Sequence, residues 1–231
     1  MKTSARLHFL HAIAAVGILL GGPGTATCRA DILYALNLGG NTIEKFTPGG
    51  TGSVFASTGL SVPYGLAFDS VGNLYVSNVG SNTIVKFTPG GTSSVFASTG
   101  LDGPEGLAFD SAGNLYAANH NGSTIEKFTP GGTGSVFAST GLCAPGGLAF
   151  DSAGNLYAAN RIGSTIEKFT PGGDGSVFAS SGLSTPNFLA FTNEVGVPLK
   201  LANQVPEPTS AVLLLGSGAM ILQRRRRAVT R

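Results

Sequence analysis

"GLAFDSAGNLYAAN", residues 106–119, is repeated without change at residues 147–160 and returns as "GLAFDSVGNLYVSN" at residues 65–78. Successive copies begin 41 residues apart, and a shortened copy, "FLAFTN", begins 41 residues further on, at residue 188. A fixed period of this length indicates a repeat architecture, in which each unit buries its apolar surface against its neighbours. The repeat therefore decides the fold.

Each unit divides into four short apolar runs separated by turn residues. In the unit that starts at residue 106 the runs are "GLAFD", "NLYAAN", "TIEKFT" and "SVFAST". Short runs rich in Phe, Tyr, Ile, Val and Thr between Gly, Asn and Pro predict β-strands rather than helices. We predict an all-β fold, a small β-propeller of four 41-residue blades with four strands each. A β-solenoid of stacked coils is the rival architecture.

The phase of the repeat predicts how the ring closes. The body of the chain starts in the second strand of a unit, with "ILYALN" at residues 32–37, and ends in a lone first strand at Phe188–Phe191. If these two strands pair, a strand-swap (velcro) closure completes the fourth blade and removes the open sheet edges. Two alternatives stay open: two chains could form one eight-bladed ring, or the arc could remain open and bind a partner.

The repeated units resemble the NHL and SMP-30/gluconolactonase-like propeller repeats over residues 32–192. Such repeats occur in lactonases, lyases and binding scaffolds, so the resemblance implies a fold more than a function. In the enzymes of this group, the resemblance implies a divalent metal at the mouth of the channel, held by acidic and Asn side chains. The matching candidates here form an asparagine set with one member in each blade: Asn37, Asn78, Asn119 and Asn160.

No unique carboxylate accompanies this asparagine set. We therefore expect no metal site, no cofactor and no catalytic residue. The repeated Asp69, Asp110 and Asp151 have a structural explanation, because the Asp side chain in Asp-Ser-x-Gly-Asn accepts a backbone N–H two residues further on. Calcium binding in these turns is the alternative, although calcium requires more oxygen ligands than such a turn offers.

Function is expected where the repeats differ. One face of the propeller carries nearly invariant turns, and the other carries loops whose residues vary from unit to unit. Binding residues concentrate in loops on a rigid scaffold. Our candidate binding set for a glycan or protein ligand is Tyr64, Asp102, Glu105, His120 and Arg161. Neutral drift in exposed loops is the competing explanation.

Residues 1–30 have the features of a secretory signal peptide. Lys2 and Arg6 precede an apolar stretch, and small residues at positions 28 and 30 favour cleavage by signal peptidase between Ala30 and Asp31. Residues 31–208 hold six basic and twelve acidic residues, a net charge of −6. An acidic body disfavours nucleic acid as a partner.

Residues 205–231 have the features of a second targeting segment. After the propeller (residues 31–192) and a linker (193–204), residues 205–231 contain a Pro-Glu-Pro motif, an apolar stretch at 209–223 and an arginine cluster. The apolar stretch, as a helix of about 22 Å, is short for a hydrocarbon core of about 30 Å. The residues of the motif and of the cluster are Val205, Pro206, Glu207, Pro208, Arg224, Arg225, Arg226 and Arg227.

This tripartite tail resembles the PEP-CTERM sorting signal of Gram-negative bacteria. The resemblance implies an exosortase as processing partner and transient anchoring in the inner membrane through residues 209–223. It further implies delivery to the cell surface or the extracellular matrix. We expect an exported, non-catalytic binding or structural protein. The alternative is a lactonase-like or lyase-like propeller enzyme with a divalent metal in its channel.

Overall fold

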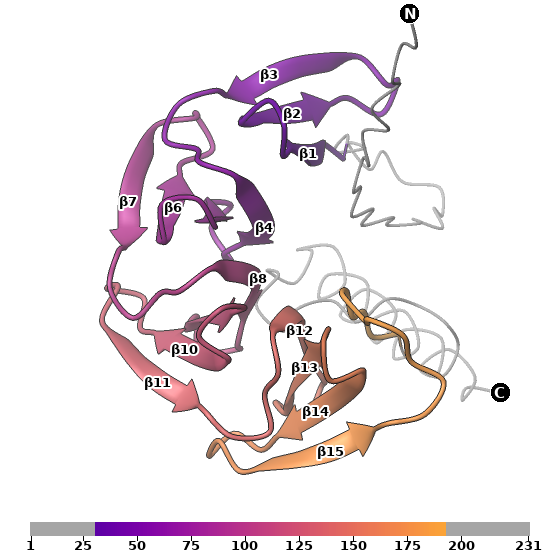
Figure 1. The fold of residues 1–231 in the computed structure, drawn as a ribbon. Helices are drawn as coiled ribbons and strands as arrows, with labels where there is room; N and C mark the ends of the chain where they lie inside the picture. Colours follow the sequence, from indigo (N-terminus) through magenta and orange to yellow (C-terminus); the bar gives the residue numbers. More distant parts are fainter. Residues whose placement is uncertain (1–30, 193–231) are drawn as a thin grey trace, which may run out of the picture.

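The computed structural model describes residues 31–192, and these form fifteen β-strands in four antiparallel sheets that follow one another around an arc (Figure 1). The described residues contain no helix, so the predicted all-β propeller class is confirmed. The predicted signal peptide and the sorting segment lie outside the described residues.

Each sheet is one blade of the propeller, and its strands pair in chain order. The first blade has three strands: β1 (Leu33–Asn37), β2 (Thr42–Phe46) and β3 (Gly52–Ala56). The second has four: β4 (Pro63–Phe68), β5 (Leu74–Asn78), β6 (Thr83–Phe87) and β7 (Ser93–Ala97). The third consists of β8 (Pro104–Phe109), β9 (Leu115–Asn119), β10 (Thr124–Phe128) and β11 (Gly134–Ala138). The fourth consists of β12 (Pro145–Phe150), β13 (Leu156–Asn160), β14 (Thr165–Phe169) and β15 (Gly175–Ala179).

The Asp-Ser-x-Gly-Asn turns join the first two strands of each four-stranded blade. In the second blade Asp69 Oδ1 accepts hydrogen bonds from the backbone N–H groups of Val71 and Asn73, at 3.1 and 2.8 Å. Its Oδ2 accepts from the Asn73 side chain at 2.7 Å. The same bonds recur around Asp110 and Asp151, which confirms the structural role predicted for these aspartates.

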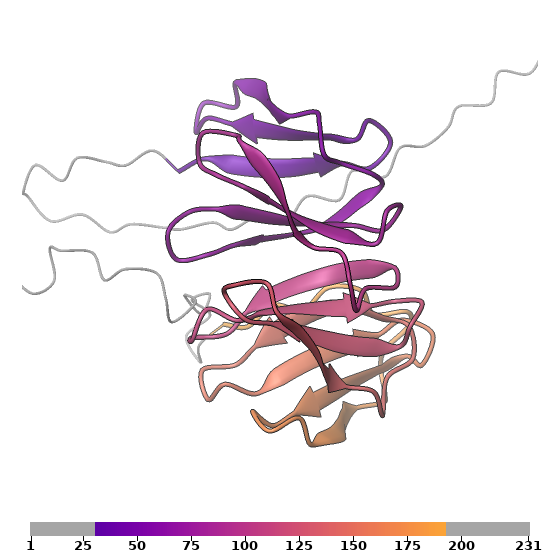
Figure 2. The same ribbon diagram turned by 90° about the vertical axis from the view of Figure 1, so that its left-hand side faces the viewer.

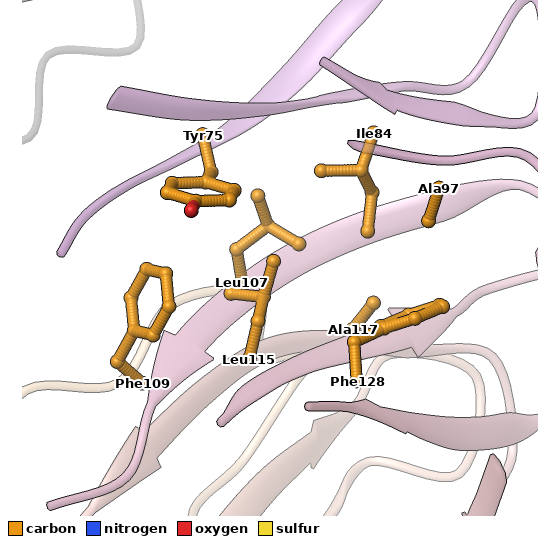
Figure 3. Packing of buried hydrophobic residues seen from close by; sticks show 8 residues of the cluster. All are labelled: Tyr75, Ile84, Ala97, Leu107, Phe109, Leu115, Ala117 and Phe128. Atoms are coloured by element: carbon orange, nitrogen blue, oxygen red, sulfur yellow. The ribbon is translucent and has the colours of Figure 1, made fainter. Parts of the chain in front are cut away.

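The core lies between blades. Tyr75 on β5 packs edge-on against Phe96 of its own blade and against Phe109 of the next, with ring centroids 4.9 and 5.0 Å apart. Figure 3 shows Tyr75 and Phe109 in one apolar cluster between the second and third blades. The other side chains of that cluster are Ile84, Ala97, Leu107, Leu115, Ala117 and Phe128. Because the same tyrosine and phenylalanines recur at every junction, each blade meets the next in the same way.

Glycines let the inner strands of neighbouring blades touch at the backbone. A Cβ atom at Gly106 would collide with the carbonyl oxygen of Gly146 and would lie 3.0 Å from Gly147 Cα. Gly65 meets the Glu105 carbonyl in the same way, and Gly147 meets the Asn187 carbonyl. A repeated backbone contact of this kind fixes the rotation between successive blades.

The structure differs from the predicted ring closure. The first blade keeps three strands, with β1 at its edge, and Phe188–Phe191 forms no strand. The first and fourth blades lie at opposite ends of the arc in both views (Figures 1 and 2). The prediction of a closed four-bladed ring was therefore wrong for the described residues. The ring does not close because the rotation between successive blades, set by the repeated inter-blade contact, adds up to less than a full circle over four blades.

The inner-strand contact can be tested by the stability of a variant at Gly106. Substitution Gly106→Ala places a methyl group against backbone atoms, which cannot rotate away, so we expect a loss of about 2–3 kcal/mol in the free energy of unfolding. Gly131→Ala is the matched control, because its Cβ would meet only Thr129 Oγ1 at 3.9 Å. Denaturant unfolding of both variants measures the difference, and equal stabilities would contradict the contact.

Candidate functional site

The variable loops of three blades start from a common backbone geometry. The residue after the second strand of each blade donates its N–H to a carbonyl in the loop before the first strand. These bonds join Val79 to Val62, His120 to Gly103 and Arg161 to Ala144, at 3.1, 3.0 and 3.2 Å. The scaffold thus holds one position in register around the arc, and the sequence places a different side chain there in each blade.

Glu105 is the centre of the site. It follows Pro104 at the start of β8, and its side chain is only 7% exposed. Arg161, which follows β13 in the next blade, donates from Nη1 to both carboxylate oxygens, at 2.9 and 3.1 Å. A buried carboxylate paired with a guanidinium across a blade boundary is a charge-assisted contact that the repeat itself does not require.

His120 lies on the other side of the same carboxylate. Its Nδ1 atom is 3.6 Å from Glu105 Oε1, which is beyond hydrogen-bond distance. This Nδ1 is buried and has no hydrogen-bond partner among the described residues. Burial raises the pKa of the Glu105 carboxyl above its usual value, while the charges of Arg161 and His120 act in the opposite direction.

Tyr64 belongs to the next part of the site. Its hydroxyl oxygen accepts a hydrogen bond from Asn187 Nδ2 at 2.8 Å, and its ring lies parallel to that of Phe188, with centroids 6.5 Å apart. Asn187 Oδ1 is buried and has no hydrogen-bond partner within residues 31–192. A Cβ at Gly146 would lie 2.6 Å from this oxygen and 3.1 Å from Arg161 Cδ, so Gly146 makes room for both side chains.

Four of the five residues in the predicted binding set therefore lie in one contiguous group, which we call the glutamate cluster. Its members are Tyr64, Glu105, His120, Arg161 and Asn187. Asp102 lies outside it, because this residue is exposed and the hydrogen bonds that hold it to Asn119 and Asn121 come from its backbone. Asn187 was not predicted, although its position 41 residues after Gly146 marked it as a varied residue.

The side chains of the asparagine set make hydrogen bonds within their own blades. Asn119 Nδ2 donates to the Gly100 carbonyl at 2.8 Å and to Thr124 Oγ1 at 3.0 Å, and its Oδ1 accepts from the Asp102 N–H at 3.2 Å. Asn78 and Asn160 make the equivalent bonds, and Asn37 keeps the bond to Thr42. These amides tie loops to strands, which leaves them poorly placed to hold an ion.

Three general features of residues 31–192 bear on function. No group of three or more His, Cys, Asp or Glu side chains that could hold a metal ion occurs in this part of the chain. No helix that could cross a bilayer is present in the same residues. The single cysteine, Cys143, is exposed and unpaired within them.

Comparisons of the sequence with known families locate the sorting signal. The chain carries a PEP-CTERM protein-sorting motif at residues 204–227. A profile for the N-terminal part of strictosidine synthase-like proteins matches residues 94–125. A search of curated protein sequences finds no match.

Solved structures similar to this chain are β-propellers with different activities. Virginiamycin B lyase from Staphylococcus aureus matches with a TM-score of 0.62 and 17% identity, over 71% of this chain and 58% of the lyase chain. A chain of a nidogen/laminin complex matches with a TM-score of 0.63 and 26% identity, over 71% and 65% of the two chains. A putative gluconolactonase matches with a TM-score of 0.61 and 22% identity, over 71% and 65%.

These similarities establish the propeller fold and the sorting motif. The chain spans 58%, 54% and 61% of the first three solved structures that it matches. Because lyases and a nidogen complex share this fold, the fold alone does not indicate the function, and the residues of the site have to be considered.

Because Glu105 and Arg161 form an ion pair, we expect the free energy of unfolding to depend on pH. A carboxyl whose pKa is raised in the folded state binds more protons folded than unfolded. Stability therefore falls as pH rises from the usual toward the raised pKa. Arg161→Leu removes the opposing charge and raises the pKa of Glu105 further, so we expect a loss of about 1–3 kcal/mol at pH 7 that is largely regained near pH 4.

The control is the double variant Glu105→Gln/Arg161→Leu, which has no carboxylate to titrate at this position. Thermal unfolding of both variants between pH 4 and pH 8 measures the effect. A pH profile for Arg161→Leu that matches that of the double variant would contradict the role given to Glu105.

Proposed function

We propose that this protein is an exported, non-catalytic binding protein that an exosortase processes, and that it binds glycans at the cell surface or in the extracellular matrix. On this proposal signal peptidase cleaves between Ala30 and Asp31, and residues 209–223 hold the precursor in the inner membrane until the exosortase acts near residues 205–208. The sorting motif supports the export route, and the glutamate cluster supports the binding function.

One observation carries the binding function: a cross-blade ion pair with a buried carboxylate lies beside two buried polar atoms that lack partners in the described residues. Buried polar groups in folded proteins are nearly always paired, and unpaired ones need an explanation. His120 Nδ1 and Asn187 Oδ1 are these atoms. A hydroxyl group, which both donates and accepts, suits such atoms, and sugars carry many hydroxyls.

The aromatic pair beside the cluster supports the same ligand class. Tyr64 and Phe188 have nearly parallel rings, at 15°, and Phe188 is 46% exposed. Sites for small ligands combine apolar or aromatic surface with a few placed polar groups. An aromatic face next to a carboxylate and a guanidinium offers that combination to the apolar side and the hydroxyl groups of a sugar ring.

A lyase-type or lactonase-type enzyme is the second candidate, and His120 is the residue that favours it. Its imidazole lies 3.6 Å from a buried carboxylate whose pKa is raised, and these are the two kinds of group that transfer protons in general acid–base catalysis. The metal-dependent version fits poorly, because Arg161 already occupies both oxygens of Glu105 and the amides of the asparagine set are committed to loops.

The binding proposal predicts a saturable glycan ligand for the body from Asp31 to Gln204. We expect Glu105→Gln and Tyr64→Ala each to weaken binding at least about tenfold, which corresponds to about 1.4 kcal/mol. Asp174→Asn is the charge-matched control, because Asp174 is exposed in a turn on the opposite face. A glycan array followed by calorimetry measures this. Retained binding in both cluster variants, or lactone or lyase turnover by the wild type, would overturn the proposal.

The export route predicts a defined mass. Protein recovered from its native host should lack residues 1–30 and the arginine cluster Arg224–Arg227. Intact mass spectrometry measures this directly, and Glu207→Ala, which disrupts the Pro-Glu-Pro motif, should retain the tail. A surface protein that keeps its arginines would contradict processing by an exosortase without touching the binding proposal.

A further inference from the structure

The two ends of the arc expose the two halves of a contact that the chain already makes three times. At each internal junction, a phenylalanine on the last strand of one blade packs against a phenylalanine on the third strand of the next. The pairs are Phe55–Phe87, Phe96–Phe128 and Phe137–Phe169, with ring centroids 6.1, 6.0 and 6.1 Å apart. The receiving rings Phe87, Phe128 and Phe169 are each 0% exposed.

At the fourth blade, the phenylalanine of the last strand has no phenylalanine of a following blade to pack against within residues 31–192. Phe178 on β15 is the fourth member of the outgoing series, and it is 59% exposed, whereas Phe55, Phe96 and Phe137 are half-buried. The residue 41 positions after Phe169 is Ser210, so the sequence provides no fourth receiver after β15. Ala179 is also more exposed than its counterparts in the other blades.

At the first blade, the third-strand type of phenylalanine is present, but no phenylalanine of a preceding blade packs against it within residues 31–192. Phe46 on β2 stands 41 residues before Phe87, and it is half-buried rather than fully buried. Leu33 on β1 is 41% exposed, although its counterparts Leu74, Leu115 and Leu156 are 1%, 1% and 0% exposed. The first blade therefore presents an apolar receiving face with no blade against it in the described residues.

The last described segment takes the place of a fourth inner strand, after β4, β8 and β12. The Asn187 carbonyl meets Gly147 as the Gly146 carbonyl meets Gly106, and Phe191 packs on Tyr157 at 4.9 Å, as Phe150 packs on Tyr116. In every other blade such an inner strand pairs with a second strand. The first blade has a second strand, β1, without an inner partner, but it lies at the far end of the arc.

We propose that two copies of this chain join head to tail into one eight-bladed ring. Phe188–Phe191 of each copy pairs with β1 of the other copy, and Phe178 of each packs on Phe46 of the other. The occupant is a second copy because each edge repeats an interface that the chain builds internally, so the two edges are complementary by construction. A two-fold arrangement satisfies both ends of both copies and gives β1 of each copy an inner partner strand.

The curvature of the arc agrees with a ring larger than four blades. The chain superposes on 58% of a lyase propeller and on 65% of a putative gluconolactonase with TM-scores of 0.62 and 0.61. One copy therefore covers more than half of such a ring but not all of it, and a ring of eight blades needs a smaller rotation per blade than those propellers have.

The test is the solution mass of the processed protein from its native host, measured by light scattering over a hundredfold range of concentration. We expect a dimer throughout. Phe178→Asp should give a monomer, because it places a carboxylate in the junction. Val177→Asp is the matched control: Val177 is 59% exposed, as Val54, Val95 and Val136 are at 58, 63 and 62%, so its exposure does not depend on a missing blade.

A cross-linking experiment separates a dimer from closure within one chain. In a Cys143→Ser background, Phe46→Cys and Phe178→Cys together should give a disulfide-linked dimer under oxidation. A wild-type monomer at every concentration would overturn the proposal. A disulfide within a single chain, no disulfide at all, or loss of the dimer in Val177→Asp as well as in Phe178→Asp would also overturn it.

Discussion

The rest of this structure depends on the backbone contact between the inner strands of neighbouring blades. Gly65, Gly106 and Gly147 each allow a carbonyl from the following blade to approach within the space of a missing Cβ atom. The tyrosine that packs between two phenylalanines then fills the outer part of the same junction. Together these contacts determine the angle at which one blade follows another, and the repeat imposes that angle on every internal junction.

This contact also positions the glutamate cluster. Glu105 is the residue whose carbonyl meets Gly65, and the Ser77 hydroxyl donates to the same carbonyl at 2.6 Å, so its backbone is held on two sides. Arg161 reaches the carboxylate from a loop that starts from the common backbone geometry of the variable face. The scaffold is therefore rigid where the blades are alike, and it brings together the side chains in which they differ.

The period of the sequence was sufficient to predict the strands, the blades and the role of the aspartate turns, because these features depend on residues within one unit. Ring closure depends on the angle between units, which residue spacing does not encode, and the predicted closed ring was wrong for this reason. Comparing the units drew attention to Glu105, His120 and Arg161, but it could not tell that the exposed Asp102 lies outside the glutamate cluster. The hydrogen bonds of the asparagine set could not be predicted, because a repeated polar residue at the end of a strand can equally face a channel or hold a loop.

The inter-blade contact gives one fixed rotation, which is too small for four blades to close. The most direct test is the solution mass of an engineered chain in which residues 31–192 occur twice in tandem. We expect a monomer whose mass equals that of two copies of residues 31–192, because eight blades complete the ring within one chain. A tandem chain that itself dimerises, or a single body that is a closed monomer, would contradict it.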